Sequence, residues 1–411
     1  MPNKKQTKVH RRLLFTTNEG YGHFHPLVPI AKKARAAGHT VAFACPSVLS
    51  PVVEASGFQV FPTGQDADQD PELEQILAQV RKMPPGPELD ALLWAGFKAR
   101  RMLPDLIDIC HSWKPDVLVR ECAELGACIA AEHLGLPHAA VQICASFYIE
   151  ANLKYMSKYL DPIRKNIGLA PDPELESLYR YLFLSFMPPG FHKLAPPELI
   201  PSTTHLIRPE VFDQSGKETL PEWIKNLPKQ PTVYVTLGTE ISNIIPGIYP
   251  HFIQTIITGL RDEDINLIVT IGRDKDPADF GKQPSNVHIE RYIPNSLLLP
   301  HCDLIVMHGG SNSLIAAVDA GLPMVIVLPM IADQPVNAKR CATLNLGQVV
   351  NITSLTSDAI GDAVREVLHN SYYRENVHQL QDEMHSLPKL EYAVSLLEKL
   401  AAEKSALINA E

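Results

Sequence analysis

A short stretch of the C-terminal half, "HGGSNS" at positions 308–313, carries residue types that can hold an anionic ligand. It follows the apolar run "DLIVM", which predicts a buried strand, and it leads into an apolar run that predicts a helix. Gly309 and Gly310 have no Cβ, so the backbone can approach a ligand closely. Free amides and the helix dipole attract negative charge at such a turn. The stretch predicts a phosphate seat, although an ordinary capped helix start has the same local pattern.

Two further polar residues, Asp333 and Gln334, come just after the next predicted strand, "MVIVL". Polar groups at the carboxyl ends of strands line the ligand crevice of open α/β sheets. A carboxylate beside an amide offers the acceptors and donors that sugar hydroxyls require. Taken alone, the same pair is also typical of a solvated loop.

In the N-terminal half, histidines and carboxylates follow two other predicted strands. His23 and His25 lie in the loop "NEGYGHFHP" after the strand "LLFTT". Glu121 and Glu124 lie in "VRECAE", which follows the predicted strand "DVLV". A histidine held by a carboxylate can act as a general base. A solvated loop histidine, and a surface ion pair of Glu121 with Arg120, are the alternatives.

These groups are positioned by a repeated alternation of strand and helix patterns. Further strands are predicted at 40–44, 138–143, 232–238 and 266–272, and a helix begins near Leu27 and ends near Gly38. Alternation at this spacing predicts βαβ units and parallel sheets. Between about 150 and 207 the pattern breaks in a segment that is rich in aromatics and proline and lacks clear strands.

The predicted fold class is therefore α/β, with two doubly wound Rossmann-like domains. A chain of 411 residues is too long for one compact core, which supports this division. We expect the first domain at 1–207, a linker at 208–230, the second domain at 231–390 and an amphipathic C-terminal helix at 391–411.

Composition excludes several classes of protein. The formal net charge of -9 argues against nucleic acid as a partner. The seven cysteines form no CxxC pair, which is typical of reduced core thiols in a cytoplasmic protein. The basic first twelve residues lack the apolar run of a signal peptide, and no window reaches the roughly 18 apolar residues of a membrane span. We expect a soluble protein.

The order of the motifs resembles family 1 glycosyltransferases, the UDP-glycosyltransferase superfamily. The resemblance is carried by "RYIPNSLLLPHCDLIVMHGG", by the segment from the glycine turn to Asp333 and Gln334, by "NAKRCATLNLG", and by "LLFTTNEGYGHFHPLVPIAKKARAAGHTVAFACP" with its Gly-His-x-x-Pro loop. It spans about 300 residues of the chain. "VRECAELGACIAAEHLGLPHA" and "PDPELESLYRYLFLSFMPPGF" are similar to segments of bacterial antibiotic glycosyltransferases. The resemblance implies a GT-B fold, with two Rossmann-like domains facing a central cleft.

The resemblance also implies roles for the N-terminal groups. His23 matches the base that takes the proton of the acceptor hydroxyl in an inverting displacement, and Glu121 matches the carboxylate that orients this base. His25 is a rival base for which we expect a structural role. Glu124 remains a rival partner because many relatives carry an aspartate where this chain has Glu121.

In the C-terminal domain the resemblance implies a donor site. Tyr292, in place of the usual tryptophan, should stack on the nucleobase, and Asn295, in place of the usual glutamine, should hydrogen-bond to the edge of the base. The implied diphosphate ligands are His308, Gly310, Asn312 and Ser313, with Thr239 as a weaker candidate. Asp333 and Gln334 should hold the donor sugar.

No metal and no cofactor are expected beyond the nucleotide-sugar donor. The Asp66–Asp68 pair has the Asp-x-Asp spacing of manganese-dependent glycosyltransferases, but it lies in an acidic loop for which solvation is the simpler interpretation. The acceptor should bind in the N-terminal domain against aromatic side chains. The candidates are Trp94, Phe97, Phe147, Tyr148, Tyr155, Met156, Tyr159, Phe183 and Phe186, many of which can equally be core.

One position bears on the nucleotide. Family members that use UDP-sugars commonly place a glutamate eight residues after the histidine that matches His308, where it binds the ribose hydroxyls, and here that position is Ala316. A deoxyribose loses little at such a site, so the sequence favours a dTDP-sugar over a UDP-sugar. Two other functions share the architecture, a nucleotide-sugar epimerase and a non-catalytic nucleotide-sugar-binding partner protein.

Overall fold

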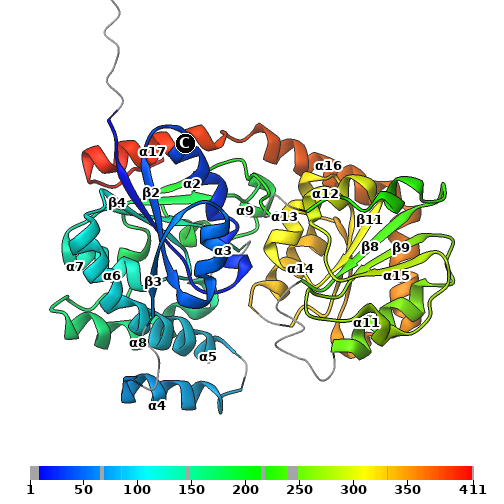
Figure 1. Ribbon diagram of the computed structural model, residues 1–411, viewed down its shortest axis with the longest axis horizontal. Coiled ribbons are helices and arrows are strands. Elements are labelled where there is room, and N and C mark those ends of the chain that lie inside the picture. Colours follow the sequence, from blue (N-terminus) through cyan, green and yellow to red (C-terminus); the bar gives the residue numbers. More distant parts are fainter. Residues whose placement is uncertain are drawn as a thin grey trace, which may run out of the picture.

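The computed structural model describes residues 9–64, 69–84, 86–144, 149–213, 218–238, 249–330 and 332–409. The chain forms two lobes, each built on one parallel sheet with helices on both faces (Figure 1). The predicted α/β class with two Rossmann-like halves is confirmed. The central strands β4, β8 and β11 are buried along their whole length, which explains why consecutive apolar residues mark them in the sequence.

The first sheet has seven strands in the order β3-β2-β1-β4-β5-β6-β7. They are β1 (Arg12–Thr16), β2 (Thr40–Pro46), β3 (Gln59–Thr63), β4 (Val117–Glu121), β5 (His138–Val141), β6 (Leu182–Ser185) and β7 (Thr204–Leu206). The expectation that 150–207 lacks strands was wrong, because β6 and β7 lie there. These strands have only four and three residues and stand between proline-rich loops, so they leave no alternating pattern.

The helices of this lobe flank the sheet and cross its edges. They are α1 (Tyr21–Phe24), α2 (Leu27–Ala36), α3 (Ser50–Ala55), α4 (Pro71–Val80), α5 (Pro87–Ala91), α6 (Ala99–Trp113), α7 (Gly126–Leu134), α8 (Ile149–Asn166) and α9 (Pro189–His192). A π-helical segment, Leu92–Lys98, joins α5 to α6.

The second sheet has six strands in the order β10-β9-β8-β11-β12-β13, which is the same winding as the first. They are β8 (Thr232–Thr236), β9 (Asn266–Thr270), β10 (Val287–Glu290), β11 (Leu304–Met307), β12 (Met324–Val327) and β13 (Gly347–Val350). The helices are α11 (Tyr249–Leu260), α12 (Asn295–Leu298), α13 (Ser311–Asp319), α14 (Gln334–Thr343), α15 (Ser357–His369) and α16 (Ser371–Ser386).

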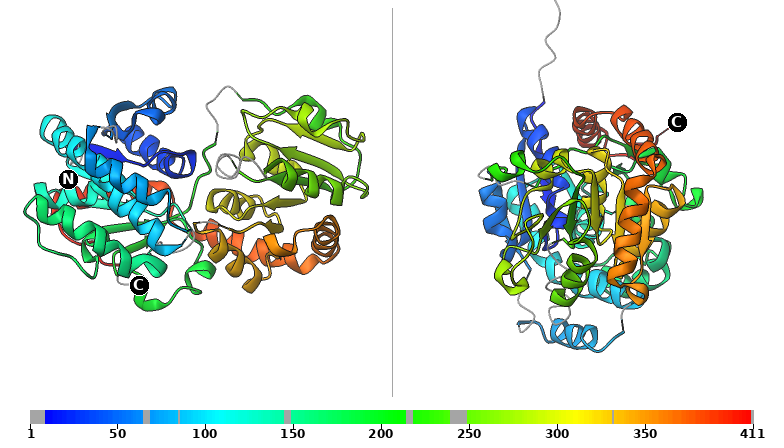
Figure 2. Two further views of the ribbon diagram at one scale, coloured as in Figure 1. Left: turned by 90° about the horizontal axis from the view of Figure 1, so that it is seen from below. Right: turned by 90° about the vertical axis from the view of Figure 1, so that its right-hand side faces the viewer.

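The chain returns to its first lobe at the end. The last helix, α17 (Leu390–Glu403), confirms the predicted amphipathic helix and packs against α2 (Figures 1 and 2). Its buried side chains, such as Leu397, share one apolar cluster with Phe15 of β1. The Lys33–Glu391 ion pair, at 2.7 Å, adds a contact at the surface. The C-terminal helix therefore belongs in space to the N-terminal lobe.

The winding fixes where a ligand can bind. In each sheet the strand order reverses between two central strands, β1 and β4 in the first lobe and β8 and β11 in the second. Loops diverge at such a switch point and leave a crevice at the carboxyl ends of the strands. His23 follows β1 and Glu121 ends β4, while His308 follows β11, so both switch points carry residues that the sequence singles out.

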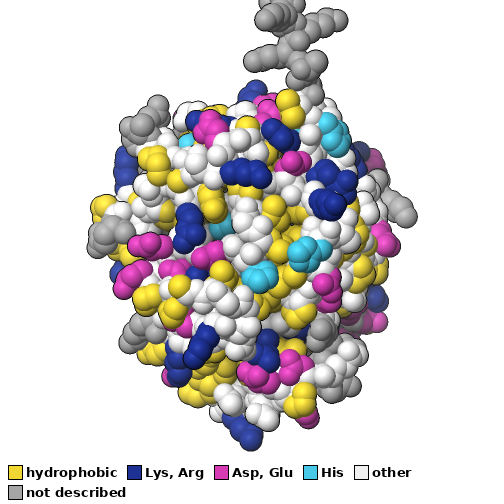
Figure 3. Space-filling view, turned by 90° about the vertical axis from the view of Figure 1, so that its left-hand side faces the viewer, with side chains coloured by type: hydrophobic (Ala, Val, Ile, Leu, Met, Phe, Trp, Pro, Cys, Tyr) yellow, Lys and Arg dark blue, Asp and Glu magenta, His cyan; other side chains and the backbone are white. Residues whose placement is uncertain are grey.

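The outer face of the N-terminal lobe shows no preference for one sign of charge. Lysines and arginines alternate there with aspartates and glutamates (Figure 3). Within the part of the chain that the structure describes, no helix is both long and apolar enough to cross a membrane.

Candidate active site

The loop after β1 and the end of β4 bring His23 and Glu121 together. The Nδ1 atom of His23 lies 2.9 Å from Oε1 of Glu121. The His23 side chain is 19% exposed, whereas that of Glu121 is fully buried. A carboxylate at Nδ1 holds the proton on that nitrogen and leaves Nε2 with a free lone pair. The pair thus has the geometry of an oriented base, with the imidazole at the surface and the carboxylate behind it.

Glu121 is surrounded by hydrogen-bond donors. Besides His23, its carboxylate accepts the side-chain amide of Asn18 at 2.7 Å and the backbone N–H of Ala123 at 2.5 Å. Burial raises the pKa of Glu121, but the charge of His23 and the three donors outweigh burial, so the pKa lies below its usual value.

Arg120 shapes the loop that presents Glu121. Its buried guanidinium donates to the backbone carbonyls of Glu121, Cys122 and Glu124, and to that of Leu178. The surface ion pair considered for Arg120 and Glu121 is therefore wrong. The arginine contacts main-chain oxygens of the loop, and the carboxylate points to His23 instead.

The rival groups have other partners. Glu124 accepts the hydroxyl of Thr16 at 2.6 Å and the backbone N–H of Ala127 at the start of α7. Burial raises the pKa of Glu124 to about 7, helped by the neighbouring charge of Glu121. His25 packs against Tyr21, and burial together with the charge of Arg273 lowers its pKa to about 4.

In the second lobe, His308 lies between two glycines. A Cβ on Gly238, which has φ +72°, would come within 2.6 Å of the His308 ring, and a Cβ on Gly310 within 2.5 Å. Burial lowers the pKa of His308 to about 4, so the ring is neutral. Its Nδ1 is buried without a hydrogen-bond partner among the described residues. A neutral imidazole with an unused nitrogen fits a ligand-binding role.

The start of α13 is held by a network that the sequence did not reveal. Asn337 is buried and donates to the carbonyl of Gly309 at 2.7 Å, to the hydroxyl of Ser311 at 3.1 Å and to Asp333 at 2.9 Å. Ser311 in turn donates to the same carboxylate oxygen of Asp333. Asp333 thus fixes the turn before α13. The "NAKR" run that contains Asn337 begins one of the segments that carry the family resemblance, but its helical pattern did not single out the Asn337 side chain.

The remaining predicted donor residues lie around this turn. Gln334 is buried and accepts the backbone N–H of Met330, and Ser313 is partly exposed in the first turn of α13. The side chain of Asn312 is exposed and donates to the carbonyl of Gly22 at 3.3 Å. This contact joins the start of α13 to the residue before His23, so the predicted phosphate seat and His23 face each other across the two lobes.

Tyr292 is partly covered. The guanidinium of Arg273 lies 3.6 Å from the centre of its ring, and its hydroxyl donates to the carbonyl of Asp213 at 2.6 Å. The Asp213 carboxylate accepts both the N–H and the hydroxyl of Ser296, beside the partly exposed Asn295. A nucleobase can therefore stack on Tyr292 only on the ring face that Arg273 does not cover, or after Arg273 moves away.

Ala316 is a less direct indicator of which nucleotide binds than its position in the sequence suggests. It is 2% exposed and belongs to an apolar cluster with Leu314 and Ala317. It offers no acceptor to a ribose, as expected. A glutamate there would bring a carboxylate into this cluster, so Ala316→Glu is not a clean test of nucleotide preference.

Several other predictions fall elsewhere. Thr239 and the Asp66–Asp68 pair lie outside the described residues, as do Phe147 and Tyr148. The described residues hold no group of three or more side chains suited to a metal ion. Of the proposed acceptor residues, Phe97, Met156, Phe183 and Phe186 are buried in the core, whereas Trp94 packs on the His23 ring.

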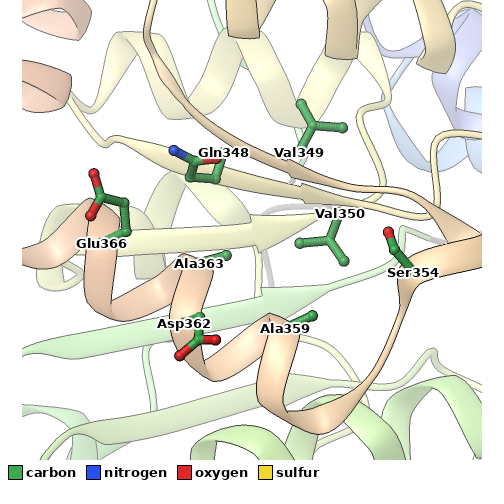
Figure 4. A pocket seen from close by; sticks show the side chains of 8 residues that line it. All are labelled: Gln348, Val349, Val350, Ser354, Ala359, Asp362, Ala363 and Glu366. Atoms are coloured by element: carbon green, nitrogen blue, oxygen red, sulfur yellow. The ribbon is translucent and has the colours of Figure 1, made fainter.

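A surface cavity of about 350 Å³ lies apart from these groups, between β13 and α15 (Figure 4). Its lining residues are Gln348, Val349, Val350, Ser354, Ala359, Asp362, Ala363 and Glu366. None of the predicted site residues lines it, and we assign it no role.

The fold and the facing groups define a GT-B glycosyltransferase, and solved structures share this fold. The chain resembles glycosyltransferase VinC in complex with dTDP, with a TM-score of 0.76, 24% identity and coverage of 95% of this chain and 99% of that one. It also resembles spinosyn rhamnosyltransferase SpnG complexed with thymidine diphosphate, with a TM-score of 0.77, 20% identity and coverage of 94% and 100%.

Sequence comparison identifies the family. Residues 32–238 match the family model "Erythromycin biosynthesis protein CIII-like, N-terminal domain", and residues 254–400 match the corresponding C-terminal domain. The chain therefore belongs to the erythromycin biosynthesis protein CIII-like family of antibiotic glycosyltransferases.

Two relatives illustrate this family. The 10-deoxymethynolide desosaminyltransferase of Streptomyces venezuelae is 26% identical over 95% of this chain and 97% of its own length. The 3-alpha-mycarosylerythronolide B desosaminyl transferase of Saccharopolyspora erythraea is 27% identical over 95% and 98%. Their activity supports a glycosyltransferase over the epimerase and the non-catalytic binding protein.

The different surroundings of Glu121 and Glu124 lead to a prediction. In Glu121→Gln the amide has one acceptor oxygen for three donors and no charge, and we expect kcat to fall roughly 10- to 100-fold, the equivalent of about 1.5–3 kcal/mol for a charged hydrogen bond. Glu124→Gln should reduce kcat less, because this carboxyl is already largely protonated below pH 7. Steady-state transfer rates for both variants, with thermal unfolding as a folding control, make the comparison. A larger loss in Glu124→Gln would show that Glu124 is the functional carboxylate.

Proposed function

We propose that the protein is an inverting, metal-independent glycosyltransferase that moves a sugar from a dTDP-sugar to a hydroxyl of an apolar natural-product aglycone. The observation that carries the proposal is the His23–Glu121 pair, 2.9 Å apart and facing the start of α13 across the lobes. A protein that only binds a nucleotide sugar has no use for an imidazole oriented by a buried carboxylate.

The reaction is a single displacement in this account. Nε2 of His23 takes the proton of the acceptor hydroxyl as its oxygen bonds to the anomeric carbon. The bond from that carbon to the diphosphate oxygen breaks, and the dTDP leaves with the electron pair. Glu121 stays ionised and stabilises the imidazolium. Glu121 is fully buried behind His23, so it is not placed to attack the sugar itself.

The leaving group is stabilised by the second lobe. The first amides of α13 and the neutral His308 meet the charge that develops on the diphosphate. Such a seat supplies the positive potential that a divalent cation supplies in other glycosyltransferases, so no metal is required. Asp333 and Gln334 lie at the edge of the same turn, where the donor sugar would extend towards His23.

The preference for dTDP rests on two points. Position 316 is an alanine and offers no acceptor to a ribose 2′-hydroxyl. Two structures of similar fold were solved with thymidine diphosphate bound. The aglycone class follows from the relatives, whose acceptors include 10-deoxymethynolide and 3-alpha-mycarosylerythronolide B.

The role of His23 gives the first test. We expect His23→Ala to lower the rate of transfer on the order of 10²–10⁴-fold, typical for the loss of a general base. Binding of dTDP should stay near that of the wild type, since His23 acts on the acceptor and not on the diphosphate. Turnover assays and calorimetric titration of dTDP measure the two quantities. Wild-type turnover in this variant would refute the assignment, and lost dTDP binding would place His23 in the donor site instead.

The nucleotide gives the second test. Matched titrations of dTDP and UDP, both in excess EDTA, should show tighter binding of dTDP, and donor-dependent transfer should survive the chelator. Equal or tighter binding of UDP would contradict the dTDP preference. Transfer that stops in EDTA and returns with manganese would contradict metal independence and direct attention to Asp66 and Asp68.

A further inference from the structure

The π-helical segment Leu92–Lys98 lies beside the catalytic loop of the N-terminal lobe. It interrupts the helix between α5 and α6 and packs against α8. A Cβ on Gly96 would lie 3.1 Å from Leu92 and 3.6 Å from the Tyr159 ring, so this glycine lets α8 approach closely. A π-helical turn inside an α-helix is frequent at functional sites. The segment is thus held firmly against α8, and it fixes the positions of the side chains that project from its other side.

Two of these side chains reach the loop that carries His23. The Trp94 ring lies 5.0 Å from the His23 ring, with 35° between their planes. Lys98, four residues on, places its ammonium 4.1 Å from the centre of the Trp94 ring and 2.8 Å from the carboxylate of Glu19. Glu19 belongs to the same loop as His23. The segment therefore holds this loop at two points, at Glu19 through Lys98 and at His23 through Trp94.

The Lys98–Glu19 pair is well placed to hold the indole. The Lys98 side chain is only 11% exposed, so solvent screens the pair less than a surface pair. Burial raises the pKa of Glu19, but the charge and hydrogen bond of Lys98 outweigh it and the pKa is lowered, so the carboxylate is ionised. A paired ammonium over the ring also attracts the indole by a cation–π contact.

We propose that Trp94 is a positioning residue for His23, and that Lys98 and Glu19 hold Trp94 in place. The inference rests on the proposed function, in which His23 is the base. The hydrogen bond to Glu121 fixes one atom of the imidazole and leaves the ring free to swing about it. An aromatic face against the imidazole removes that freedom and keeps Nε2 directed at the acceptor oxygen. Small errors in this direction lower the rate strongly.

The test compares two acceptors of like shape, 4-nitrophenol and 4-nitrobenzyl alcohol. The phenol ionises close to neutral pH, so at a mildly alkaline assay pH it is largely phenolate and needs little help from a base, whereas the alcohol depends on one. We expect Trp94→Leu to lower kcat for the alcohol roughly 10- to 100-fold and to leave the phenol near its wild-type rate. Trp94→Phe, which keeps an aromatic face, should recover most of the alcohol rate, and the dissociation constant of dTDP should not change.

A matched control is Trp113→Leu. Trp113 is buried in the same lobe against Arg12 and Phe61. The Trp113→Leu variant therefore loses the same indole as Trp94→Leu, but at a place that does not touch the loop of His23. This variant should change kcat for both acceptors by the same factor. The inference would be overturned if Trp94→Leu lowered kcat equally for both acceptors or did not lower it at all. It would also be overturned if Trp94→Phe did not recover kcat for the alcohol. If His23→Ala itself lowers kcat by the same factor for both acceptors, the assignment of His23 as the base fails, and the positioning role of Trp94 fails with it.

Discussion

A buried carboxylate beside a partly exposed imidazole is the constraint on which the site in the N-terminal lobe depends. An ionised Glu121 without water is unfavourable unless donors surround it. The structure provides three, from His23, Asn18 and the backbone of Ala123. The loop after β4, which holds Glu121 and Ala123, is in turn fixed by the guanidinium of Arg120 on its carbonyls. The orientation of one imidazole therefore engages β1, β4 and the loops after both.

The two lobes share one architecture but carry different groups at the ends of their central strands. Both sheets have the same winding, so each offers a crevice at the carboxyl end of its central strands. The first lobe fills this crevice with the imidazole of His23 and the carboxylate of Glu121. The second fills it with a helix start, two glycines and the neutral ring of His308. The contact between Asn312 and Gly22 brings the two sets of groups to one place, as a reaction between two bound substrates requires.

The sequence predicts much of this arrangement because its signals are local. Fully buried parallel strands appear as apolar runs, so β1, β4, β8, β11 and β12 could be placed to within a residue or two. The short strands β6 and β7 could not, since three or four residues give no period. The pairing of His23 with Glu121 was predicted from a motif, but the choice over Glu124 depends on how the loop folds. Asp213 and Arg273 gave no signal, and Asn337 was not singled out within its motif, because their roles arise only from contacts between distant segments.

The central claim is that a hydroxyl activated by His23 displaces dTDP directly, with Glu121 too deeply buried to form a glycosyl-enzyme. The anomeric configuration of the product tests it most directly. Proton NMR of the product that the wild-type protein forms from an α-configured dTDP-sugar reports this configuration through the coupling at the anomeric proton. The account predicts a β-linked product, with inversion at the anomeric carbon. An α-linked product would mean retention, and it would contradict the direct displacement and the roles of His23 and Glu121 together.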